Sequence, residues 1–184
     1  RFLISTFLGL ELTGVYTFYW SVANVIHSLA VVGILKSQIA PLLAAGRKSD
    51  ESFLATERHL QIEIGGWALF LSIGAIIFTP LLLPYLGRPL LHDYVPVLWL
   101  LLVATLLRVA ADGYGFALLA LHRDRAIALI AACGAIASAA LNVILTPLAG
   151  LWGAAVAASM VAAGLFVVRF YLTRSHFSPS RAGP

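Results

Sequence analysis

Three charged side chains lie inside long apolar stretches of the sequence. Arg108 and Asp112 are flanked on both sides by aliphatic residues, and Lys36 lies in an earlier apolar stretch that ends near Gly46. A charged group near the centre of a bilayer is costly, and it usually faces a partner or a water-filled cavity. We therefore interpret Arg108, Asp112 and Lys36 as candidate residues of a polar cavity that binds a charged substrate.

The spacing of these charges leaves two interpretations open. Arg108 and Asp112 are four residues apart, so they share a helix face and can pair, either as part of a binding site or as a structural ion pair. Lys36 has no acidic residue near it in the sequence, and it either reaches the headgroups or faces a cavity. At 1.5 Å per residue it lies about 15 Å from the end of its helix, which favours the cavity.

The first long apolar segment also carries a polar stripe at helical spacing. Its members are Thr17, Ser21, Asn24 and Ser28, with Trp20, His27 and Gln38 beside them. Hydrogen bonds between helices account for the hydroxyl groups. The amide of Asn24 and the ring of Trp20 are of the kind that hold sugars, so we expect a cavity wall here. His27 taken alone fits a structural role.

The sequence contains no constellation typical of an enzyme. It has no glycine-rich phosphate loop, no nucleophile elbow and no metal-ligand spacing, and His59 and Glu63 are four apart without an HExxH motif. We therefore expect neither catalysis nor a bound cofactor. Without an ATP-binding motif, any transport would draw on an ion gradient, the membrane potential or substrate flux.

The composition indicates a membrane protein. Hydrophobic residues make up 61% of the chain and charged residues 11%, with a mean hydropathy of +0.95, whereas about 25% of residues are charged in soluble domains. The net charge of +4 comes from residues between the apolar segments, which is typical of membrane topology and not of nucleic-acid binding. The single cysteine, Cys133, excludes a disulfide within the chain.

The apolar segments predict an all-α, polytopic membrane helical bundle. We expect a truncated first helix over Arg1–Leu8, a link over Gly9–Gly14 and five full transmembrane helices. These are Val15–Ala45, Ile64–Leu83, Tyr94–Leu121, Arg125–Leu145 and Leu151–Tyr171. Residues 1–174 would form one transmembrane lobe, and residues 175–184 a disordered tail.

Two local signals support these boundaries. Ser49 is a predicted N-cap, followed by Asp50 and Glu51 in the first helical turn, where acidic residues suit the helix dipole. Pro147 and Gly150 predict a tight turn between the last two spans, because proline ends the hydrogen-bond ladder and glycine tolerates unusual backbone angles. The last two spans would therefore form an antiparallel hairpin.

The basic residues predict the orientation of the bundle. With alternating connections, one side holds Arg47, Lys48, Arg58, Arg123, Arg125, Arg169, Arg174 and Arg181. The other side holds Arg88. Basic residues concentrate on the cytoplasmic side of membrane proteins, so we expect the first side and the C-terminus in the cytoplasm.

Two segments resemble a known family. In the hairpin, the matching positions are Leu141, Asn142, Pro147, Gly150, Trp152, Gly153, Ala154 and Ala155. Near the start, they are Arg1, Gly9, Gly14, Val15 and Tyr16, without the aspartate that would precede Arg1. Over Arg1 to Arg174 the chain resembles the C-terminal half of the polysaccharide biosynthesis (Wzx-type O-antigen) flippases, in the multidrug/oligosaccharidyl-lipid/polysaccharide exporter superfamily.

The resemblance implies a function and partners. It implies translocation of a polyprenyl-pyrophosphate-linked oligosaccharide across the bacterial inner membrane by alternating access, by a protein with a further N-terminal half. A polysaccharide polymerase and glycosyltransferases would be further partners. The alternatives are a cation-coupled multidrug exporter of the same superfamily, with Asp112 carrying the ion, a membrane-embedded glycosyltransferase or ligase, and a scaffold that transports nothing.

Overall fold

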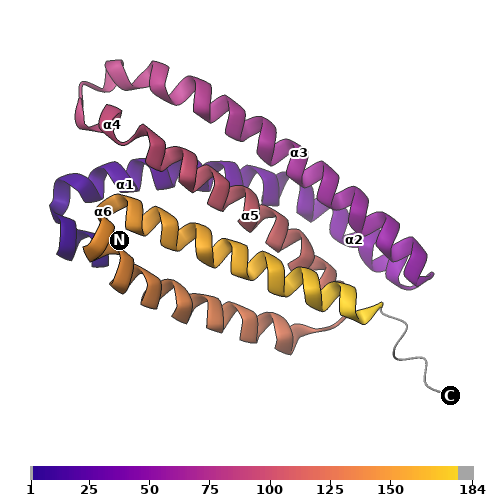
Figure 1. Cartoon of the computed structure of the whole chain (residues 1–184). Helices are drawn as coiled ribbons and strands as arrows, with labels where there is room; N and C mark the ends of the chain where they lie inside the picture. Colours follow the sequence, from indigo (N-terminus) through magenta and orange to yellow (C-terminus); the bar gives the residue numbers. More distant parts are fainter. Residues whose placement is uncertain (1, 178–184) are drawn as a thin grey trace.

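The computed structural model describes residues 2–177, except for the side chains of residues 2–5, 35 and 36. Every regular element in this part of the chain is a helix (Figure 1). The long elements are α1 (Phe2–Ala30), α2 (Lys36–Gly46), α3 (Asp50–Leu82), α5 (Val95–Ala120) and α6 (Asp124–His176). The short ones are a π-helix (Val31–Leu35), a 3-10 helix (Leu83–Leu86) and α4 (Leu90–Asp93).

The first part of the chain differs from the predicted pattern. The expected link over Gly9–Gly14 is wrong, because the helical geometry breaks only at Gly9, with φ 82° and ψ 174°. The residues between the two glycines include good helix formers, so α1 resumes at once. The expected single helix over Val15–Ala45 is interrupted by the π-helix Val31–Leu35, which separates α1 from α2.

The start of α3 forms as the sequence predicts. Ser49 is the N-cap, and its hydroxyl accepts a hydrogen bond of 3.1 Å from the backbone N–H of Ser52. Asp50 and Glu51 occupy the first turn. The helix then continues through the polar stretch to Leu82 without a break, so one rigid rod joins the polar region to the apolar span.

The predicted hairpin is the bend within α6. Gly150 has φ 60° and ψ −137°, and the chain reverses there, so the two arms of α6 run antiparallel (Figure 1). A Cβ atom on Gly153 would lie 1.9 Å from the carbonyl oxygen of Leu145 in the first arm. Only glycine allows the arms to approach so closely after the turn.

The core forms around α5, which packs against α1, α3 and α6. Its buried residues join two apolar clusters, one with α1 and the second arm of α6 and the other mainly with α2 and α3. Many large apolar side chains on the outer faces are exposed, including Phe70, Phe78 and Leu129. An exposed apolar surface of this extent is expected where lipid replaces water.

Four helical segments of the described chain are long and apolar enough to cross a membrane. They are Thr6–Ile34, Asp50–Leu86, Val95–Ala120 and Asp124–His176. The last of these contains both arms of the hairpin. The protein is therefore an all-helical bundle with membrane-spanning capacity, and the number of five crossings stays a prediction.

The connections gather at the two ends of the bundle. The α2–α3 turn, the α5–α6 turn and the end of α6 lie at one end, and the α3–α5 connection and the Gly150 bend at the other (Figure 1). At the first end, Arg123 Nη2 lies 3.1 Å from His176 Nδ1. Ser175 and His176, which the sequence placed in the tail, belong to α6, and residues 178–184 lie outside the described chain.

Candidate functional site

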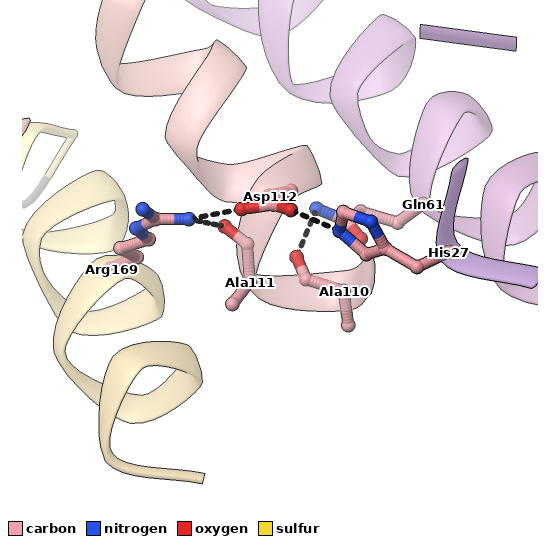
Figure 2. A network of polar contacts seen from close by, with 6 residues as sticks. All are labelled: His27, Gln61, Ala110, Ala111, Asp112 and Arg169. Carbon is pink, nitrogen blue, oxygen red and sulfur yellow. Dashed lines mark hydrogen bonds and ion pairs between the residues drawn. The ribbon is translucent and has the colours of Figure 1, made fainter. Parts of the chain in front are cut away.

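The carboxylate of Asp112 on α5 is held from two sides (Figure 2). His27 Nε2 of α1 lies 2.8 Å from its Oδ2, and Arg169 Nη1 of α6 lies 2.7 Å from its Oδ1. The same Nη1 donates to the carbonyl oxygen of Ala111 at 3.0 Å. A single carboxylate on α5 thus links three helices.

The pair expected between Arg108 and Asp112 does not form. Arg108 is exposed, and no hydrogen bond or ion pair among the described residues involves it. The spacing of four residues does place both on one side of α5, since both line the same cleft. Both carboxylate oxygens of Asp112, however, are already occupied by His27 and Arg169 from other helices.

Two glycines on α5 make room for the polar side chains around Asp112. A Cβ atom on Gly115 would lie 3.1 Å from Arg169 Nη1, and one on Gly113 would lie 2.6 Å from Gln61 Nε2. Gln61 Nε2 donates to the carbonyl oxygen of Ala110 at 3.5 Å (Figure 2). The missing side chains therefore let Arg169 and Gln61 reach the backbone of α5.

Arg169 and Gln61 belong to this network although sequence patterns do not identify them as site residues. Arg169 was grouped with the basic residues of one membrane side, but its side chain is only 11% exposed and lies against Asp112. Its Nε atom is buried and has no hydrogen-bond partner among the described residues. The signal was present in the sequence, because Arg169 lies inside the predicted span Leu151–Tyr171 between aliphatic and aromatic neighbours.

Most of the predicted site residues come together beside this network. Trp20, Asn24, His27 and Arg108 line a small cavity of about 40 Å³. Trp20 and Arg108 also line a wider, open cleft of about 330 Å³, together with Asp112 and Arg169. The two cavities share Trp20 and Arg108, so they lie next to each other between α1, α5 and α6.

The first arm of α6 lines the wider cleft with small residues. They are Ala131, Gly134, Ala135 and Ser138. Small side chains leave the space in front of Arg108 unfilled. The cleft can therefore receive a group from outside without displacing a large side chain.

Other predicted polar residues lie elsewhere. The side chain of Lys36 falls outside the described part of the structure. Ser21 and Ser28 are exposed and line neither cavity. Gln38 donates a hydrogen bond of 3.0 Å to Glu63 on α3. Of the polar stripe, Asn24 therefore belongs to the site, together with its neighbours Trp20 and His27, whereas the hydroxyl groups of the stripe do not.

The described residues contain no cluster of three His, Cys, Asp or Glu side chains that could hold a metal ion. Comparison of the chain with protein-family models, curated proteins and solved structures gives no match. The resemblance seen in the hairpin and near the start of the chain therefore stays a prediction.

Proposed function

We propose that the protein is one lobe of a membrane exporter that flips a polyprenyl-pyrophosphate-linked oligosaccharide by alternating access. It would act in a bacterial inner membrane with its C-terminus in the cytoplasm, and as a transporter and not as an enzyme. Glycosyltransferases would supply its substrate, and a polysaccharide polymerase would consume it. The observation that carries the proposal is Arg108, an arginine on the wall of an open cleft that has no counter-charge among residues 2–177 as the structure describes them.

The charge balance of the cleft supports an anionic ligand. Arg169 is neutralised by Asp112, and Asp112 has a second partner in His27. Arg108 has none among the described residues, so its guanidinium remains available. An arginine without a counter-charge on a cleft wall attracts anions, and its planar fork matches two phosphate oxygens.

The other lining groups suit the remainder of such a substrate. Trp20 lies beside Arg108 in both cavities, and Asn24 contributes an amide to the smaller one. An aromatic face can pack against a sugar ring, and an amide both donates and accepts hydrogen bonds. One region therefore offers a phosphate-binding group and sugar-binding groups together.

The test is charge reversal at Arg108 in cells whose glycan export depends on this protein. Arg108→Glu should abolish export without lowering the abundance of the protein, because Arg108 holds no buried partner. Arg108→Lys should retain part of the export, since the charge remains but the fork is lost. The control is Arg88→Glu, which reverses an exposed arginine that lies outside this cleft and lines a separate pocket together with Glu11.

Two outcomes would overturn the proposal. Unchanged export in Arg108→Glu would show that this cation does not bind the substrate. Loss of drug export in Asp112→Asn, with glycan export intact, would favour the cation-coupled multidrug exporter, in which Asp112 carries the ion.

A further inference from the structure

A second buried carboxylate lies at the end of the bundle where the α2–α3 turn and the end of α6 meet. Glu57 of α3 has a side chain that is 0% exposed. Its neighbours along α3, Phe53 and Leu60, belong to an apolar cluster that also contains Leu42 of α2. Phe177, directly after α6, packs on Phe53 with a ring separation of 5.4 Å. Glu57 is thus enclosed without lining either cavity of the cleft.

This carboxylate has few partners for its degree of burial. Its Oε2 lies 3.4 Å from Nη2 of Arg174, and neither of its oxygens accepts a hydrogen bond within the described chain. Arg174 is 43% exposed, and its guanidinium also lies over the ring of Phe170 at 5.6 Å. Tyr114 on α5 is a further titratable group near this pair, and its side chain forms a hydrogen bond with Arg174. The residues that α2 adds to the cluster are apolar.

Two forces act on Glu57 in opposite directions. Removing an ionised carboxylate from water is costly, and hydrogen bonds usually offset that cost. Here the one offsetting contact is a long ion pair with a side chain that water can reach. Protonation would remove the cost of burying the charge, and Glu57 would then no longer hold Arg174, whose remaining contacts are those with Tyr114 and Phe170.

We propose that Glu57 is a proton-binding site that controls the contact between α3 and the C-terminal end of α6. In the ionised state Glu57 holds Arg174, and the last turns of α6 stay against α3. When Glu57 binds a proton from the solvent on the Arg174 side, the ion pair is lost and Arg174 moves outward. The end of α6 then separates from α3, and the contact between Phe53 and Phe177 opens.

Infrared difference spectra of the purified full chain in lipid nanodiscs test the proton site directly. Lowering the pH should produce the carbonyl band of a buried carboxylic acid in the wild type, and the band should be missing in Glu57→Gln. The matched control is Glu63→Gln on the same helix, where the carboxylate accepts a hydrogen bond from Gln38. The band should persist in that control.

A variant that leaves the carboxylate in place gives a second test. Arg174→Gln removes the charge that favours ionised Glu57, so the band should appear at higher pH than in the wild type. If the band has the same midpoint pH in Arg174→Gln as in the wild type, Arg174 does not control the protonation of Glu57. A band that survives in Glu57→Gln would show that the proton binds elsewhere.

Spin labels report whether protonation moves α6. The exposed positions Ala55 on α3 and Tyr171 on α6 can carry the labels once the one cysteine is removed by Cys133→Ser. The distance between the labels, measured by electron–electron double resonance, should lengthen as the pH falls. In Glu57→Gln it should be long at every pH. If the distance between the labels changes neither with pH nor in Glu57→Gln, protonation of Glu57 does not control the position of α6, and the proposal is wrong.

Discussion

Asp112 lies between α1, α5 and α6, and Glu57 lies between α3 and the end of α6; the two carboxylates differ in how their charge is satisfied. Asp112 is 25% exposed and has two contacts below 3 Å, from His27 on α1 and Arg169 on α6. Glu57 is fully buried and has one ion pair of 3.4 Å with a half-exposed arginine. The number and quality of partners, and not burial alone, therefore separates a fixed charge from one that can be neutralised.

The largest expected effect on the free energy of unfolding comes from removing the carboxylate of Asp112. Asp112→Ala leaves Arg169 nearly buried without its carboxylate, which should lower the free energy of unfolding by about 3 kcal/mol. Unfolding of the purified protein in detergent, together with its abundance in the membrane, measures the loss. Asp93→Ala, at an exposed position on α4, is the control and should change little. Equal effects of the two substitutions would contradict the assigned role of Asp112.

A smaller effect is expected at the glycine that admits Arg169. Gly115→Ala places a methyl group 3.1 Å from Arg169 Nη1, so the guanidinium must shift, and we expect a cost of about 1 kcal/mol. The control is Gly66→Ala on α3, where an added Cβ meets nothing within 4 Å. That substitution should stabilise the helix, because alanine favours helix over glycine. The same unfolding measurement compares the two variants, and a stabilising Gly115→Ala would argue against close packing of Arg169.

The smallest effect on the free energy of unfolding is expected at Glu57, the carboxylate that we propose binds a proton. Glu57→Gln at neutral pH should change the free energy of unfolding by less than about 1 kcal/mol, because the lost ion pair is long and Arg174 can return to water. The comparison with Asp112→Ala under identical conditions is the informative measurement. A cost at Glu57 as large as that at Asp112 would mean that both carboxylates are fixed structural charges.

The elements of the fold could be predicted because their signals are local. The cap at Ser49 and the bend at Gly150 each depend on a few adjacent residues, and both are observed. The predicted link over Gly9–Gly14 begins at the observed break at Gly9, but it is too long. The residues between the two glycines can form helix, and in the structure they do. The π-helix after Ala30 had no signal that periodicity could detect.

The site could be predicted only in part, because its pairing depends on contacts between helices. Trp20, Asn24, His27, Arg108 and Asp112 were selected by polarity within apolar segments, and they do gather. The sequence paired Asp112 with Arg108 because a spacing of four residues is visible along one helix. The actual partners, His27 and Arg169, are distant in sequence. Glu57 was hidden for the same reason, since the end of α6 buries it.

The most direct measurement is the binding of farnesyl diphosphate to the purified protein by titration calorimetry. Arg108→Gln should weaken binding roughly tenfold, because a hydrogen bond to a charged group contributes about 1.5 kcal/mol or more. Arg88→Gln should leave the affinity unchanged, and farnesol, which lacks the diphosphate, should bind more weakly than farnesyl diphosphate. Equal affinities of wild type and Arg108→Gln would contradict the account of the cleft as an anion-binding site.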